Sequence, residues 1–141
     1  MAYYAVKVKQ VPEQSIAIVR GQATMANLPV RIRELFDQFY AGFKGKGGLN
    51  VVLYHDPGAA GEFEIACGAQ VEQGGNSVTP GGTVATTVYI GPYDQMKPAH
   101  VAIHSWAREN RRRLAGPSWE IYGHWSDDPA KLRTDIFYLL E

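Results

Sequence analysis

The chain has one cysteine, no net charge and no long apolar run, and each of these features excludes a class of protein. Cys67 alone cannot form an internal disulfide, and it fits a reducing compartment. No apolar stretch near the N-terminus is long enough for a signal peptide or a membrane span. Fourteen basic and fourteen acidic side chains cancel, so no overall field would attract nucleic acid. We expect a soluble, cytoplasmic protein that binds neither membranes nor nucleic acid.

The sequence also lacks the usual motifs of metal, hydrolase and phosphate sites. His100 and His104 are one helical turn apart, but no carboxylate lies between them as in zinc proteases and no third ligand is evident. No serine lies in a nucleophile elbow. The glycines of segment 74–82 lead into a predicted strand, so they do not form a phosphate loop before a helix. We therefore expect no metal and no cofactor.

The first half of the chain has one predicted helix, because apolar residues recur at helical spacing over residues 28–43. Pro29 lies where a first helical turn tolerates proline, and glycines follow the end of the pattern. Tyr4, Val6 and Val8 alternate with polar or small residues, which is typical of a strand covered on one face. Further strands are predicted over 16–20, 49–54 and 63–71, and His55 to Gly58 is the turn between the last two.

The second half repeats this order, with strands over 83–90, 119–125 and 134–140 and a helix over 96–108. Gly21 and Gly91 lie about seventy residues apart, as do the Asp-Pro pairs that begin at 56 and 128. This suggests duplication within a single domain spanning 1–141, with modules 1–73 and 83–141 and a linker 74–82. We predict an α+β fold of two strand–helix–strand–strand modules. They would form a mostly antiparallel sheet with two helices on one face and a central ligand pocket.

Glu120 is the residue that most needs explanation, because its neighbours are aromatic or β-branched and burial of an unpaired charge is costly. Side chains alternate along a strand, so Trp119 and Ile121 point one way while Glu120 and Tyr122 point the other. We expect the apolar set to pack on the helices. Glu120 would then be either a solvated strand residue or the carboxylate of a pocket.

Aromatic residues near the same landmarks favour the pocket. A carboxylate among aromatic rings suits a cationic, partly apolar ligand, since the rings and the carboxylate both attract positive charge. The same carboxylate could act as a general base toward water. For each ring taken alone, core packing is the simpler role. The candidate ligand-binding residues, besides Glu120, are Tyr54, Tyr89, Tyr93, Trp106, Tyr122 and Tyr138.

A set of short motifs in the second half carries a family resemblance: Gly91-Pro92-Tyr93, Trp106, Glu120-Ile121-Tyr122, Asp128-Pro129 and Thr134-Asp135-Ile136. With these motifs the chain resembles the GyrI-like small-molecule-binding family, which includes the effector-binding domains of multidrug-responsive transcription activators. The resemblance implies two modules around an aromatic pocket, in which a buried glutamate meets cationic lipophilic compounds. Glu120 has the position of that glutamate, and Tyr93 and Trp106 fall on family positions. Asp135 departs from the usual glutamate.

Three functions remain open. The first is a stand-alone binding protein for a lipophilic, cationic or aromatic compound. The second, suggested by hydrolases in the family, is cleavage of cyclopropane-bearing DNA-alkylating toxins, with Glu120 as general base and Tyr122 or Tyr93 donating a hydrogen bond to the departing oxygen. The third is a protein-interaction role, with DNA gyrase or a separate regulator as a possible partner. We expect this chain to lack the helix-turn-helix domain that precedes the pocket in full-length regulators.

Overall fold

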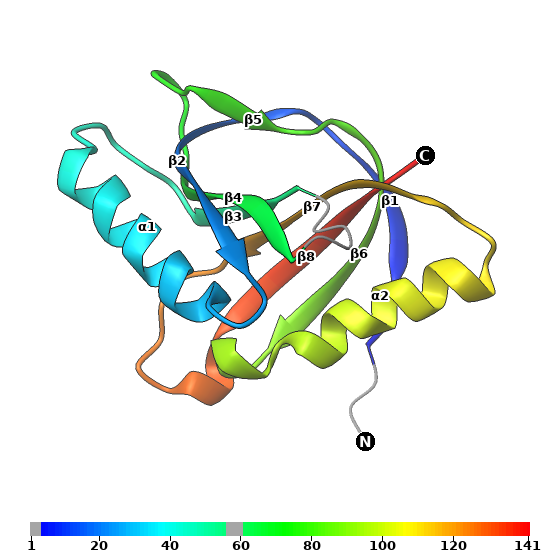
Figure 1. Cartoon of the computed structure of the whole chain (residues 1–141). Helices are drawn as coiled ribbons and strands as arrows, with labels where there is room; N and C mark the ends of the chain where they lie inside the picture. Colours follow the sequence, from blue (N-terminus) through cyan, green and yellow to red (C-terminus); the bar gives the residue numbers. More distant parts are fainter. Residues whose placement is uncertain (1–3, 56–60) are drawn as a thin grey trace.

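The computed structural model describes residues 4–55 and 61–141. In this part of the chain, eight strands form one antiparallel sheet in the order β1-β6-β8-β7-β3-β4-β2-β5 (Figure 1). The strands are β1 (Lys7–Val11), β2 (Gln14–Thr24), β3 (Asn50–Tyr54), β4 (Glu62–Gln70), β5 (Ser77–Thr79), β6 (Gly82–Ile90), β7 (Leu114–Tyr122) and β8 (Arg133–Leu140). The helices are α1 (Leu28–Gly42) and α2 (Lys97–Glu109), with short 3-10 helices η1 (Tyr93–Gln95) and η2 (Pro129–Lys131).

The element order confirms the predicted duplication. β2-α1-β3-β4 and β6-α2-β7-β8 are two copies of one strand–helix–strand–strand unit, and they join where β3 pairs with β7. The predicted linker 74–82 contains a strand of its own, β5. The two extra strands are exchanged between the units, because β1 pairs with β6 of the second unit and β5 pairs with β2 of the first. Each outer edge of the sheet is therefore covered by a strand from elsewhere in the chain.

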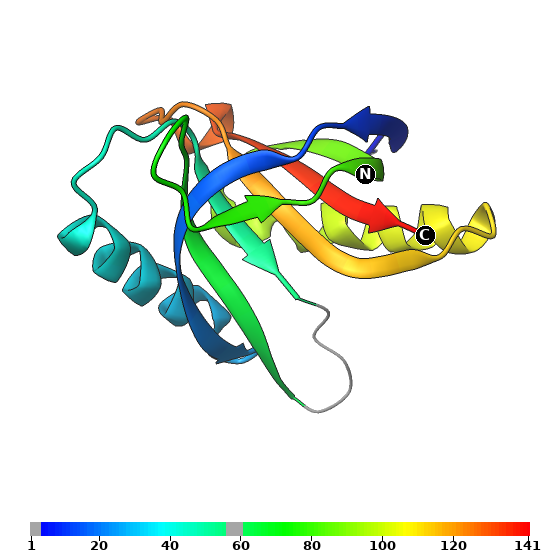
Figure 2. The same cartoon turned by 90° about the horizontal axis from the view of Figure 1, so that it is seen from above.

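The sheet must curl, because its connections are too short for a flat one. β1 lies at one edge and β2 is next to the other edge, yet only Pro12 and Glu13 separate them. Two linking residues span about 10 Å, whereas six strand spacings in a flat sheet cover about 29 Å. The second such link, from β5 to β6, touches the first, since a Cβ on Gly81 would lie 2.8 Å from the backbone nitrogen of Glu13. Figure 2 shows the resulting bent sheet.

The face enclosed by the curl has its own apolar core. Trp119 is almost fully buried there and stacks on Phe137 with 5.5 Å between the ring centroids. Ile16, Val51 and Val84 belong to the same buried cluster, and Val11 and Ile121 pack against it. The expectation that Trp119 and Ile121 pack on the helices is therefore wrong. The alternation of side chains along a strand shows which residues share a face. It does not show which of the two faces the curled sheet encloses, and here the enclosed face is the one with Trp119 and Ile121.

Both helices lie on the opposite face, as predicted. α1 packs on β2 and β4 through Leu35 and Phe39, and α2 packs on β6 and β8 through Ala99, Ile103 and Ala107. The helices predicted over 28–43 and 96–108 agree with α1 and α2 to within their terminal residues. Glu120 and Tyr122 also point to this face, since Glu120 lies opposite Val52, a residue of the core beneath α1.

Three predicted strands differ from the structure. The strand predicted over 16–20 is β2, which runs from Gln14 to Thr24. β7 ends at Tyr122, so the predicted strand over 119–125 extends too far and misses the start at Leu114. At the N-terminus Tyr4 and Val6 are partly buried, but Val8 is 46% exposed because β1 is an edge strand. Of the predicted turn from His55 to Gly58, residues 56–58 lie outside the described residues.

We predict that Gly68→Ala destabilises the fold by about 1–3 kcal/mol or more, because overpacking of a filled site forces backbone shifts. Gly68 lies in the middle of β4, where a Cβ would be 1.8 Å from the carbonyl oxygen of Ala17 on the neighbouring strand. Chemical denaturation measures the change. Gly42→Ala is the matched control. Gly42 is the last residue of α1, and a Cβ there would have no atom within 4 Å. This variant should be as stable as the wild type or slightly more stable. Equal stability of the two variants would contradict the prediction.

Candidate functional site

A cavity of about 1310 Å³ lies on the helix-covered face of the sheet, between α1 and α2. Its floor is the seam between the two units, where β3, β7 and β8 run side by side. The space exists because β7 presents small residues, Gly116 and Ser118, before Glu120 and Tyr122. Eight aromatic side chains line the cavity: Phe36, Tyr40, Tyr54, Phe63, Tyr93, Tyr122, Trp125 and Tyr138.

Glu120 lies on the floor of this cavity and is only 4% exposed. One carboxylate oxygen, Oε1, accepts hydrogen bonds from the hydroxyls of Tyr54 at 2.8 Å and Tyr122 at 2.6 Å. The first tyrosine comes from β3 and the second is two residues further along β7, so the seam between the units brings them together. Two phenol donors make a buried carboxylate tolerable, because each replaces a lost water contact.

The other carboxylate oxygen of Glu120, Oε2, contacts His100 of α2. The distance to the ring nitrogen Nε2 is 2.6 Å, and the second ring nitrogen, Nδ1, lies 2.7 Å from the hydroxyl of Tyr138 on β8. The network therefore runs from Tyr138 through His100 to Glu120 and on to Tyr54 and Tyr122. Four elements, β3, α2, β7 and β8, each contribute at least one member, so the site depends on the tertiary fold and not on any single segment.

Burial and the negative Glu120 keep the tyrosines of the network protonated. Burial, followed by the charge of Glu120, raises the pKa of Tyr54 and of Tyr122 well above the usual value. The same two causes raise the pKa of Tyr138 to about 12. These phenols are thus hydrogen-bond donors throughout the physiological range. Burial also raises the pKa of the Cys67 thiol to about 12, which agrees with the core role expected for that residue.

The structure brings together five of the seven candidate residues. Glu120, Tyr54, Tyr93, Tyr122 and Tyr138 all line the cavity. Tyr93 lies on η1 with its ring edge-on to Tyr122, 5.1 Å between centroids.

The other two candidates, Tyr89 and Trp106, lie outside the cavity lining. Tyr89 is buried in the core beneath α2, and its hydroxyl donates to the carbonyl oxygen of Pro92 at 2.6 Å. Trp106 packs against the same core. Both are large aromatic residues on the helix-covered side of the sheet, but they pack in the core beneath α2 and do not line the cavity.

Sequence reasoning missed His100 and the aromatic residues of α1. His100 lies one turn beyond Met96 and one residue after Ala99, so it is on the sheet-facing side of the predicted helix, where a polar residue calls for a partner. The apolar face of α1 is wider than the part of it that is buried, which consists of Leu35 and Phe39. The surplus stripe, Ile32, Phe36 and Tyr40, faces the cavity.

The mouth of the cavity carries both signs of charge. Arg33 on α1, Lys97 on α2 and Asp94 on η1 are exposed side chains at its rim, together with His104 and His124. Trp125 lies in the loop after β7. It is 76% exposed and also lines the cavity. A ligand would therefore reach the buried carboxylate of Glu120 through a mouth that carries charges of both signs.

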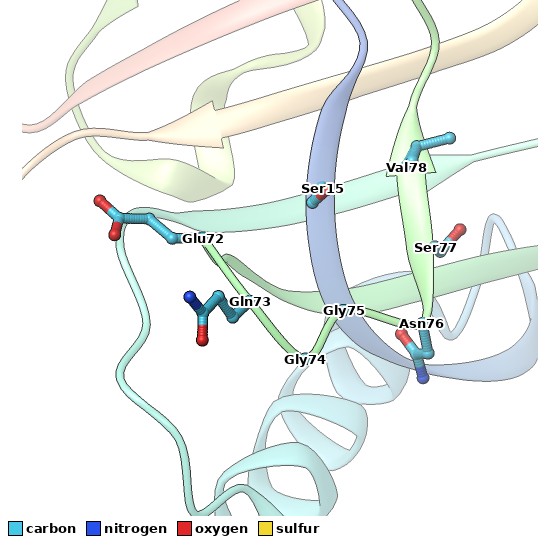
Figure 3. Close-up of a pocket in the computed structure, with 8 residues that line it drawn as sticks. All are labelled: Ser15, Glu72, Gln73, Gly74, Gly75, Asn76, Ser77 and Val78. Atoms are coloured by element: carbon cyan, nitrogen blue, oxygen red, sulfur yellow. The ribbon is translucent and has the colours of Figure 1, made fainter.

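A second hollow, of about 350 Å³, lies beside the segment that leads into β5 (Figure 3). Asn76 in this hollow bonds both backbone groups of Ile18, with its side-chain oxygen 2.9 Å from the nitrogen and its side-chain nitrogen 3.0 Å from the oxygen. Its amide thus continues the pairing of the sheet edge. Glu72 is the one titratable side chain among the described residues that line it. This hollow is a consequence of edge packing, and the Glu120 cavity is the candidate site.

In residues 4–55 and 61–141, no group of three or more His, Cys, Asp or Glu side chains is placed to hold a metal ion. Over the same ranges, no helix is long and apolar enough to cross a bilayer.

A large aromatic cavity in a duplicated α+β fold defines a small-molecule-binding domain. Residues 4–140 match the model of the GyrI-like small molecule binding domain, and the chain belongs to this family. The fold expected from the sequence resemblance is confirmed. A search among curated proteins finds no match.

Solved structures share this fold at low sequence identity. The C-terminal domain of EcmrR is 22% identical with a TM-score of 0.78, and the match covers 99% of each chain. The match to EcmrR in its complex with DNA covers 98% of this chain but 57% of that one. A hydrolase from Listeria innocua has a TM-score of 0.61 at 10% identity, covering 96% of this chain and 91% of the other. SAV2435 bound to tetraphenylphosphonium also has a TM-score of 0.61, at 11% identity, with 99% and 94% covered.

We predict that part of the tyrosine set titrates late in the folded protein. Tyr54, Tyr122 and Tyr138 have raised pKa values, so folding favours their protonated forms. Their contribution to stability is complete below about pH 10, where unfolded tyrosine titrates, and is lost as pH rises through the raised pKa values, about 12 in the case of Tyr138. Ultraviolet absorbance of tyrosinate during an alkaline titration measures the ionisation of the tyrosines as a function of pH. Glu120→Gln should shift the late phase to lower pH, and simultaneous titration of every tyrosine near pH 10 in the folded protein would contradict the assignment.

Proposed function

We propose that this protein binds a lipophilic, cationic or aromatic small molecule in the Glu120 cavity, with Glu120 as the countercharge. One observation carries the proposal: a buried carboxylate lies on the floor of a large hollow walled by aromatic rings. Ring faces attract cations, and the attraction is stronger where water is excluded. The tetraphenylphosphonium bound by SAV2435, which shares the fold, is a compound of this class.

The size of the cavity also supports a bulky ligand. Drug-sized molecules occupy pockets of about 300–1,000 Å³, and the hollow here, at about 1310 Å³, accommodates one with room for water. Tyr40 and Trp125 are exposed aromatic side chains of the lining, and a ligand that covers them removes apolar surface from water.

We predict that Glu120→Gln selectively weakens cation binding. Methyltriphenylphosphonium and triphenylphosphine oxide share three phenyl rings and differ in charge, so their affinities separate the role of the carboxylate from that of the rings. The variant should bind the cation about tenfold more weakly or worse, a loss of about 1.4 kcal/mol, and the neutral oxide nearly as before. Isothermal titration calorimetry measures both.

The matched control is Glu109→Gln, an exposed carboxylate at the end of α2 outside the cavity lining. It should leave both affinities unchanged. If Glu120→Gln binds the cation as tightly as the wild type does, Glu120 is not the countercharge and the proposed function loses its basis.

A second candidate is hydrolysis of a cyclopropane-bearing alkylating compound, and the Glu120–Tyr122 pair favours it. The carboxylate can take a proton from water as the water oxygen bonds to the strained carbon and a ring bond breaks. Tyr122, or Tyr93 beside it, can donate a hydrogen bond to the oxygen on which charge develops. The likeness to the Listeria innocua hydrolase lies in the fold.

This candidate predicts turnover of a cyclopropane-containing alkylator that Glu120→Gln abolishes. Product formation is followed by liquid chromatography and mass spectrometry, with Glu109→Gln as the active control. Binding of one equivalent without product would exclude hydrolysis and leave the binding function. The third expectation, a protein partner such as DNA gyrase, stays a prediction.

A further inference from the structure

The two oxygens of Glu120 have different partners. Oε1 is held by two tyrosines that stay protonated, whereas Oε2 faces a side chain that can itself carry a positive charge. His100 is mostly buried, with 21% of its side chain exposed, and its Nε2 lies 2.6 Å from Oε2. The carboxylate that would attract a cationic ligand already has a potential cation of the protein beside it.

His100 can gain or lose a proton without breaking the network. When the ring is neutral, Nε2–H donates to Glu120 and Nδ1 accepts from the Tyr138 hydroxyl. When the ring is protonated, both nitrogens donate, and the Tyr138 oxygen accepts while its hydrogen turns elsewhere. The hydrogen bonds at both ring nitrogens survive in either state, but the net charge of the cavity floor changes from negative to neutral.

We propose that His100 is the built-in counterion of Glu120 and sets the charge preference of the cavity, so that a bound cation replaces the proton on His100. With His100 neutral the floor is negative and takes a cationic ligand. With His100 protonated the floor is neutral and takes an uncharged aromatic ligand. This inference rests on the proposed function and names the residue that regulates it.

The groups that face His100 from the sheet come from three strands, β3, β7 and β8. From the sheet it faces Glu120, Tyr138 and Tyr54, whose ring is 6.5 Å from that of His100. The tyrosines titrate far above neutral pH. Histidine is the side chain type that changes charge between about pH 5 and 8.

Other charged groups lie further out. His104 is one turn along α2, with its ring 5.0 Å from that of Tyr138, and His124, Asp94, Lys97 and Arg33 line the mouth. All five are exposed and screened by solvent. His104 and His124 are therefore the alternative sources of any pH dependence, and the experiment has to separate them from His100.

The test is calorimetric titration with methyltriphenylphosphonium, whose charge does not depend on pH, in paired buffers of different ionisation enthalpy from about pH 5 to 8. We expect wild-type protein to release protons on binding the cation. Its affinity should fall by up to about tenfold per pH unit toward the acid end, the limit for exchange of one proton. Triphenylphosphine oxide should bind with no proton release.

Substitutions of single histidines identify the side chain that releases the proton. His100→Gln and His100→Asn should bind the cation at all pH values without proton release, and the second variant is available if the first does not fold. If neither folds, the wild-type titrations decide. His55→Gln should behave as wild type, because His55 lies outside the cavity lining and contacts Glu64 instead.

Each alternative outcome has a separate meaning. Loss of the pH dependence in His104→Gln or His124→Gln, with retention in both His100 variants, would overturn the assignment. So would cation binding by wild type without proton release, and so would failure of both folded His100 variants to bind at any pH. No cation binding by wild type at any pH would instead refute the proposed function itself.

Discussion

The site depends on one constraint, the burial of the Glu120 charge. A carboxylate removed from water is costly unless donors replace the lost water contacts. Here Tyr54, Tyr122 and His100 supply them from a strand of the first unit, a strand of the second and a helix. Since no two adjacent segments could provide this set, the carboxylate is stabilised only where the units join. The pairing of β3 with β7 therefore fixes both the fold and the place of the site.

The curled sheet explains how the protein tolerates a hollow of this size. A large cavity forfeits packing contacts, and its lining must be held open by the rest of the structure. Trp119 and Phe137 belong to a separate core on the enclosed face, which the cavity does not reach. The helix-covered face can then separate α1 from α2 at the seam, because each helix keeps its own packing on the outer strands. Stability and ligand space lie on opposite faces of one sheet.

The sequence predicted local structure and the key acid better than it predicted the other faces and partners. Apolar spacing and Pro29 were sufficient for α1, and the unusual surroundings of Glu120 marked the residue that the structure buries. The face of Trp119 was assigned wrongly, because alternation is blind to which side of a sheet is enclosed. His100 was missed because its partner is on another element. Tyr89 and Trp106 have the same chemical character as the lining tyrosines, and only packing distinguishes them.

The proposed function divides affinity and selection between different groups of the cavity. Three phenyl rings of a ligand, covered by the aromatic walls, bury on the order of 300 Å² of apolar surface, which contributes about 7 kcal/mol before ordering costs. The carboxylate adds less, because its oxygens already accept three hydrogen bonds and a cation gains only the unbalanced part of the charge. Apolar burial can therefore hold many aromatic compounds with similar strength. In the proposed function, Glu120 decides between charged and uncharged members of that set, which is the division expected of a site that recognises a class of molecules instead of one shape.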